Sequence, residues 1–180
     1  MDWVTTVLRD SELLYSAHQV DEALDRMAQA IALTLGEMNP VVLAVMMGGL
    51  VPAGKLLTRL AFPLELDYVH ATRYRRGTTG GELQWRARPM SPLKHRVVLL
   101  VDDILDEGVT LGAIIDLCRQ EGARAVYSAV LVEKQHARKP GLQHADFTGL
   151  TVDDRYVFGC GMDYKGYLRN IPGIHAVRDG

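Results

Sequence analysis

Three aspartates lie within five positions directly after an aliphatic run: Asp102, Asp103 and Asp106. The run before them, residues 97–101, is unbroken and predicts a strand buried on both faces, as in the centre of a parallel sheet. Open α/β sheets bind ligands at the carboxyl ends of their strands, where adjacent carboxylates can accept hydrogen bonds from a sugar diol or hold Mg²⁺. Because clustered like charges repel, we expect a ligand or metal at this strand end.

A glycine and a threonine follow the aspartates and open a predicted helix. Gly108 permits a tight turn and lets an anion approach the backbone, and Thr110 can cap the helix or donate its hydroxyl to a phosphate oxygen. The free N–H groups and partial positive charge of a helix N-terminus favour an anion at this junction. An anion cradle beside paired carboxylates suits a sugar phosphate bound together with a metal.

Two other interpretations use the same residues. Asp and Gly are common after strands, and Asp caps helices well, so one Asp-x-x-Gly would be ordinary turn chemistry. The three aspartates also match the Asp-Asp-x-x-Asp metal motif of prenyl-diphosphate enzymes, which carry it on a helix in an all-helical fold. Since an aliphatic β run precedes the aspartates here, we favour the phosphate interpretation.

Residues 98–110 resemble the phosphoribosyl diphosphate signature of type I phosphoribosyltransferases, with Glu107 departing from the usual Thr or Ser. The resemblance implies that Asp102 and Asp103 hold the ribose hydroxyls and Mg²⁺, and that Asp106 is a catalytic general base. It further implies that the 5-phosphate is bound by the backbone of a short loop, consisting of Glu107, Gly108, Val109 and Thr110.

A second strand–glycine–helix junction precedes the first in the chain. Residues 41–46 predict a buried strand and residues 50–60 a helix, with Gly48-Gly49 between them. The resemblance implies that this loop binds pyrophosphate through Met47 and Gly48, although purine enzymes often carry Lys or Arg where this chain has Met47. Residues 73–82 are either a solvated hairpin tip or a mobile lid, and the flexible hood loop of the family favours the lid.

The C-terminal third resembles hypoxanthine-guanine phosphoribosyltransferases. By that resemblance, Lys134 donates to the 6-oxo group of a purine, Tyr156 stacks on the ring and the backbone at Val157 reads its edge. Asp163 then helps to place Mg²⁺ or the base, and Arg169 contacts pyrophosphate. Plain alternatives remain for single residues: a solvated lysine, strand alternation around Tyr156 and a surface charge at Arg169.

The remaining pattern predicts the elements that position these groups. We expect an α/β fold with a parallel twisted sheet, helices on both faces, a hood loop and a small C-terminal cap, all in one domain spanning residues 1–180. Residues 11–14 predict a capped helix start, and residues 18–35 a longer helix. Further strands are expected at residues 64–72, 83–86 and 125–132. Cys118 is expected in the core, and His136, His144 and His175 on the surface.

Length and charge exclude several classes. The chain has 180 residues and a formal net charge of −2, without the basic excess of a nucleic-acid-binding protein. Its apolar runs are far shorter than the ~20 residues needed to span a bilayer. The N-terminus lacks the features of a signal peptide, and the two cysteines lack metal spacing. We therefore expect a cytoplasmic protein without nucleic-acid or membrane partners.

The implied reaction is Mg²⁺-dependent transfer of a 5-phosphoribosyl group from phosphoribosyl diphosphate to hypoxanthine or guanine. The products would be IMP or GMP and pyrophosphate, as in purine salvage, and the family implies a homodimer or homotetramer. Two alternatives stay open. One is a regulatory nucleotide- or RNA-binding protein on the same fold, and the other is an enzyme for another base such as xanthine, adenine or a pyrimidine.

Overall fold

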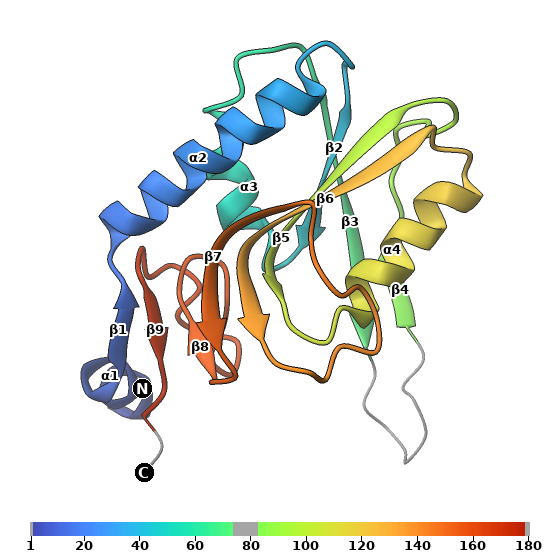
Figure 1. Ribbon diagram of the computed structural model, residues 1–180. Helices are drawn as coiled ribbons and strands as arrows, with labels where there is room; N and C mark the ends of the chain where they lie inside the picture. Colours follow the sequence, from blue (N-terminus) through green and yellow to red (C-terminus); the bar gives the residue numbers. More distant parts are fainter. Residues whose placement is uncertain (1, 74–82, 179–180) are drawn as a thin grey trace.

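The computed structural model of the protein describes residues 2–73 and 83–178 (Figure 1). Its helices are α1 (Asp2–Asp10), α2 (Ala17–Leu35), α3 (Leu50–Leu57) and α4 (Val109–Gln120). Its strands are β1 (Glu12–Tyr15), β2 (Val41–Met46), β3 (Glu65–Arg73), β4 (Leu83–Ala87), β5 (Val97–Leu105), β6 (Ala125–Gln135), β7 (Phe147–Asp153), β8 (Val157–Phe158) and β9 (Ile174–Ala176). None of these helices is long and apolar enough to cross a membrane.

The main sheet contains six of these strands in the order β4-β3-β2-β5-β6-β7. Strands β2, β3, β5, β6 and β7 run parallel, and β4 closes one edge antiparallel to β3. The aliphatic run at the start of β5 is buried between β2 and β6, which confirms the predicted central strand. The parallel strands therefore bring their carboxyl ends to one edge of the sheet.

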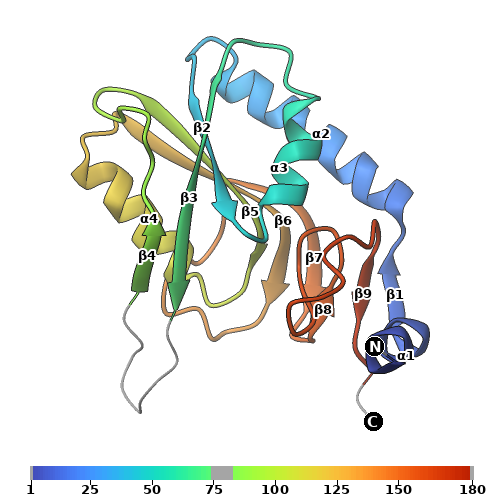
Figure 2. The same cartoon turned by 180° about the vertical axis from the view of Figure 1, so that it is seen from behind.

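Helices cover both faces of this sheet, as the sequence predicted (Figures 1 and 2). The side chains of β2 alternate between two apolar clusters, because neighbouring residues of a strand point to opposite faces. Val42 and Ala44 pack with residues of α2 and α3, whereas Leu43 and Val45 pack with residues of α4. Cys118 of α4 is fully buried in the second cluster, which confirms its place in the core.

The cap differs from the prediction because both ends of the chain build it. Strands β1, β9 and β8 form a small antiparallel sheet, so the N-terminal segment pairs with the C-terminal one (Figure 1). The predicted helix start at residues 11–14 is therefore wrong. The cap of the long helix is Ser16, whose hydroxyl accepts a hydrogen bond from the Gln19 N–H while the Gln19 side chain accepts one from the Ser16 N–H.

Two strands extend further than predicted, and the site depends on this extension. Strand β5 continues through Asp102 and Asp103 to Leu105, and β6 continues through Lys134 to Gln135. Helix α3 ends at Leu57, earlier than the predicted residue 60. The predicted lid begins at the last residue of β3, and the rest of it, residues 74–82, lies outside the described residues.

Candidate active site

Asp102 and Asp103 lie near the carboxyl end of β5. Their side chains accept hydrogen bonds from neighbouring backbone N–H groups, Asp102 from Asp103 and Asp103 from Ile104, each at 2.8 Å. Burial and the adjacent Asp103 charge raise the pKa of Asp102 well above its ordinary value, and burial also raises the pKa of Asp103. Hard oxygen donors that repel one another in this way fit a bound divalent cation such as Mg²⁺.

The glycine loop after β2 packs directly against Asp103. A Cβ atom on Gly48 would lie 1.9 Å from Oδ2 of Asp103, so only glycine fits there. A Cβ atom on Gly161 would lie 2.3 Å from the Gly48 carbonyl oxygen, which shows that the two loops are in close contact. The peptide bond between Met46 and Met47 is cis, and the Met47 side chain is half exposed. Gly48, Asp103 and Gly161 thus form one tightly packed wall.

Asp163 and Arg169 face this wall from the C-terminal loop. Arg169 donates to the Asp163 carboxylate and, through Nη1, to the Gly161 carbonyl oxygen at 2.6 Å. The same Nη1 lies 3.8 Å from Oδ2 of Asp103. The guanidinium therefore links the aspartate of β5 with the C-terminal aspartate, and it supplies positive charge where an anionic ligand would lie.

The turn into α4 has the conformation that the glycine predicted. Gly108 has φ +72°, in the left-handed region, and a Cβ atom there would lie 2.1 Å from the Leu142 carbonyl oxygen. The Leu142 N–H donates to the Gly108 carbonyl at 3.0 Å, and the Gly141 N–H donates to the Glu107 carbonyl at 3.1 Å. The segment around residue 141 thus supports residues 107–110, the loop that the sequence predicts to bind the 5-phosphate.

A pocket of about 400 Å³ opens over these groups. It is lined by all of the predicted phosphoribosyl residues together with parts of the glycine loop and the C-terminal loop, namely Asp102, Asp103, Asp106, Glu107, Gly108, Val109, Thr110, Met46, Gly48, Asp163 and Arg169. Residues 106–110 line this pocket and run into the first turn of α4, where free N–H groups favour an anion.

A second pocket, of about 390 Å³, adjoins the first. It is lined by the predicted purine residues Lys134, Tyr156 and Val157, and Tyr156 is 53% exposed. Both pockets share Asp103, Ile104, Asp106 and Asp163. A ligand in one pocket would therefore lie next to a ligand in the other along these four residues, with Asp106 among them.

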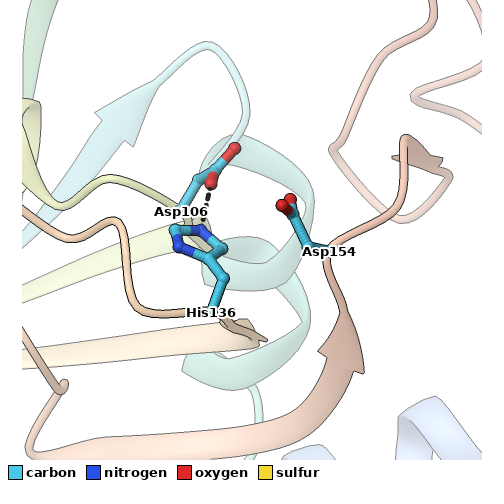
Figure 3. Close-up of side chains that lie close together, drawn as sticks. All are labelled: Asp106, His136 and Asp154. Atoms are coloured by element: carbon cyan, nitrogen blue, oxygen red, sulfur yellow. Dashed lines mark hydrogen bonds and ion pairs between the residues drawn. The ribbon is translucent and has the colours of Figure 1, made fainter.

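Two side chains contact Asp106, a lysine at the end of β6 and a histidine directly after this strand. Lys134 Nζ lies 3.0 Å from Asp106 Oδ2. His136 Nε2 lies 2.7 Å from Asp106 Oδ1, the contact that Figure 3 marks with a dashed line. Burial raises the pKa of the Asp106 carboxyl, but the hydrogen bonds from Lys134 and His136 outweigh it, so the pKa lies below its ordinary value. The lowered pKa keeps the Asp106 carboxyl in its ionised form, which is the form that a general base requires.

Asp154 completes the group of side chains in Figure 3. One donor atom each from Asp106, His136 and Asp154 lies within 4.8 Å of the others, which is a spacing that could hold a metal ion. The Lys134 ammonium already lies among them, 3.0 Å from Asp106 and 3.9 Å from Asp154. We therefore regard this group as the surroundings of a lysine cation.

Comparison with known proteins decides the family. The sequence model of a protein family, the phosphoribosyl transferase domain, matches residues 11–165, which are most of the chain. The protein belongs to this family. It is accordingly a phosphoribosyltransferase, an enzyme of the glycosyltransferase class, with the type I fold that the signature at residues 98–110 implied.

Individual relatives agree with this assignment. The chain is 27% identical over 169 residues to the hypoxanthine-guanine phosphoribosyltransferase of Streptococcus pneumoniae, covering 93% of each protein. It is 26% identical to the hypoxanthine-guanine-xanthine phosphoribosyltransferase of Tritrichomonas foetus, covering 97% of this chain and 96% of that protein. The crystal structure of a hypoxanthine phosphoribosyltransferase from Staphylococcus aureus has the same fold, with a TM-score of 0.89, 24% identity and coverage of 96% and 95%.

In this phosphoribosyltransferase, the sequence did not reveal that His136 belongs to the site. The prediction of a surface histidine is wrong, since only 6% of its side chain is exposed and it contacts Asp106. The prediction was also wrong for His175, which is partly buried and stacks on Phe158 with ring centroids 5.5 Å apart. His144 is 79% exposed, as expected. The spacing of His136 two residues after Lys134 was the available signal, because a continued strand puts both on one face.

A buried charged group at the same strand end was also missed. Glu133 and Lys139 are 4% and 7% exposed. Lys139 Nζ lies 3.0 Å from Glu133 Oε1 and also donates to the Gln143 carbonyl. Thr148 and His144 complete the contacts of the carboxylate. These contacts around Glu133 stabilise the segment around residue 141, which supports Gly108.

Proposed function

We propose that this phosphoribosyltransferase transfers the 5-phosphoribosyl group of phosphoribosyl diphosphate to hypoxanthine or guanine, giving IMP or GMP and pyrophosphate. The observation that carries the proposal is the pair of adjoining pockets, one lined by the signature loop and the other by Lys134 and Tyr156, which meet at Asp106. The names of the curated relatives, which act on hypoxanthine and guanine, support the choice of purine.

In the first pocket, the backbone from Glu107 to Thr110 binds the 5-phosphate, and Asp102 and Asp103 accept hydrogen bonds from the ribose hydroxyls. Gly48 and Arg169 meet the diphosphate, with the backbone at Met47 contributing from the same loop. Mg²⁺ would be held by Asp102 and Asp103, with Asp163 nearby, and it would neutralise charge on the departing diphosphate. Breaking the C1–O bond builds positive charge on the ribose, which the carboxylates of β5 stabilise.

In the second pocket, Tyr156 stacks on the purine and the backbone at Val157 reads its edge. Tyr156 is itself supported edge-on by Tyr164, with ring centroids 5.2 Å apart. Lys134 donates to the 6-oxo group, which distinguishes 6-oxopurines from adenine, whose 6-amino group is a donor. Asp106 accepts the N7 proton as N9 bonds to C1 of the ribose.

Xanthine is a second candidate substrate. It differs from hypoxanthine and guanine only at position 2, and the Tritrichomonas foetus relative carries xanthine in its name. Lys134 and Tyr156 address features that all three bases share. The preference among these three bases is therefore set by the groups that face position 2 of the purine.

A homodimer or homotetramer in the cytoplasm stays a prediction. Exposed apolar side chains gather beside α3 and β3, including Leu50, Leu66 and Tyr68, each between 44% and 56% exposed. Patches of this kind mark interaction surfaces, which supports self-association. Light scattering across a range of protein concentrations measures the state directly, and a mass of one chain at all concentrations would contradict the prediction.

The decisive experiment is a steady-state assay with Mg²⁺ and phosphoribosyl diphosphate, offering hypoxanthine, guanine, xanthine, adenine and uracil separately. We expect turnover with hypoxanthine or guanine and little with adenine or uracil. Clear binding of phosphoribosyl diphosphate without turnover of any base would replace this proposal with the regulatory alternative. In that case Glu107 and Met47 are the departures to examine first.

A further inference from the structure

His136 is fixed at both nitrogens of its ring. The backbone N–H of Arg138 donates to Nδ1 at 3.1 Å, while Nε2 lies 2.7 Å from Oδ1 of Asp106. A ring that accepts at Nδ1 carries its proton on Nε2, so Nε2 donates to the aspartate. Only 6% of the His136 side chain is exposed, and the ring lies beside Asp106 in Figure 3.

We propose that His136 is a positioning residue for Asp106, holding Oδ1 of the carboxylate while Oδ2 accepts the N7 proton of the purine. This inference rests on the proposed function. Lys134 contacts Oδ2 in the structure, and in this proposal it turns from Oδ2 to the 6-oxo group, which opens Oδ2 to the N7 proton. His136 then remains as the contact that keeps the carboxylate aimed.

The proton and electron balance of this step is complete. N9 of the purine forms a bond to C1 of the ribose, and the electron pair of the C1–O bond leaves with pyrophosphate. The N7 proton moves to Oδ2 of Asp106, and its electron pair becomes part of the N7–C8 double bond of the product. His136 keeps its Nε2 proton throughout, since its task is orientation.

The roles of Lys134 and His136 differ because their attachments differ. The Lys134 ammonium contacts two carboxylates, at 3.0 Å from Asp106 and 3.9 Å from Asp154, and its flexible stem can turn toward a ligand. The imidazole is buried and anchored to backbone. One partner of Asp106 can therefore move to the substrate while the other stays.

Matched substitutions separate this role from general stability. His136→Gln retains an N–H donor at about the reach of Nε2, and His136→Leu removes the donor. His18→Leu is the control, because His18 lies on α2 with 80% of its side chain exposed. We expect His136→Leu to lower kcat for hypoxanthine about tenfold to a hundredfold, with the KM for phosphoribosyl diphosphate unchanged. His136→Gln should recover most of the loss, and thermal unfolding should be similar for all three variants.

The pH profile of kcat/KM gives a second measurement. Asp106 faces Lys134 and His136 from β6 and the residues after it, Asp154 from the end of β7, and Asp103 and Asp163 across the purine pocket. Because the His136 hydrogen bond lowers the pKa of Asp106, its loss should move the acidic limb of the profile to higher pH. His136→Gln should leave the limb near the wild-type position.

A test without turnover uses long-range ¹H–¹⁵N NMR of the wild-type protein at neutral pH. His136 should be the Nε2–H tautomer, both alone and with IMP bound. Wild-type kcat and an unmoved acidic limb in His136→Leu would overturn the positioning role while leaving the proposed function intact. An Nδ1–H tautomer would overturn it regardless of activity, and absence of turnover in wild type would instead reject the proposed function.

Discussion

Lys139 and Glu133 form an ion pair in the interior, with Nζ 3.0 Å from Oε1 and both side chains less than a tenth exposed. The pair ties the segment after β6 to the strand itself. That segment donates two backbone hydrogen bonds to the loop at Glu107 and Gly108. This buried ion pair lies outside both pockets. It stabilises the segment that supports residues 107–110, the loop that the sequence predicts to bind the 5-phosphate.

Removing one partner of this pair should be costly. Lys139→Met leaves the Glu133 carboxylate buried beside fewer donors, and we expect a loss of about 3–5 kcal/mol in the free energy of unfolding. Urea denaturation followed by circular dichroism measures it. Lys55→Met is the matched control, since the Lys55–Asp21 pair is 30% and 46% exposed and should contribute at most about 1 kcal/mol. Equal losses for the two variants would contradict the structural role of Lys139.

The Glu133 carboxylate should make the free energy of unfolding depend on pH. Burial raises the pKa of Glu133, but hydrogen bonds from His144, Lys139 and Thr148 outweigh it, so the folded-state pKa is lowered. A lowered pKa contributes stability above the unfolded value, near 4.3, that is lost as the pH falls through the folded value. Wild type should therefore lose more stability than Glu133→Gln between about pH 5 and pH 3. Parallel pH curves for the two proteins would remove Glu133 from the acid response.

Gly48 should not tolerate a methyl group. A Cβ atom would overlap Oδ2 of Asp103 at 1.9 Å, so Gly48→Ala displaces the carboxylate or the loop. We expect kcat/KM to fall about a hundredfold, the effect of a displacement near 1 Å at a reacting centre. Gly54→Ala is the control, because nothing lies within 4 Å of its Cβ position in α3, and it should stabilise the protein by up to about 1 kcal/mol. Full activity in Gly48→Ala would show that the wall against Asp103 is dispensable.

Asp106→Asn tests the proposed base. The amide keeps the shape of the side chain but accepts a proton poorly, so turnover should fall about a hundredfold or more. The affinity for phosphoribosyl diphosphate, measured by calorimetry, should change little. Asp116→Asn serves as the control on α4, where the aspartate side chain is 66% exposed. Unchanged turnover in Asp106→Asn would remove this residue from the mechanism.

Lys134→Ala tests recognition of the purine. Loss of the donor to the 6-oxo group should raise the KM for hypoxanthine about tenfold while leaving that for phosphoribosyl diphosphate nearly constant. Lys94→Ala, at an exposed position before β5, should resemble wild type. If both substrates weakened equally in Lys134→Ala, the lysine would act through Asp106 or the fold, and not through the base.

The sequence alone predicted the elements whose signals are local. The aliphatic run of β5, the glycine at the turn and the periodic face of α4 lie within a few residues of one another, and the structure has the strand, the φ +72° turn and the helix at these places. The resemblance of residues 98–110 to a known signature added the family. The segment at residues 11–14 failed because its partner strand, β9, lies more than 150 residues away in the chain.

Only the tertiary structure determined which side chains meet. The register between β5 and β6 sets Leu105 opposite Glu133. The residues that follow them in the sequence, Asp106 and Lys134, come into contact. The same alignment brings His136 onto Asp106 and buries Glu133 against Lys139. Strand propensity is a property of neighbouring residues, whereas pairing register depends on packing between distant segments. The sequence therefore predicted the catalytic candidates, and the folded sheet determined which side chains contact them.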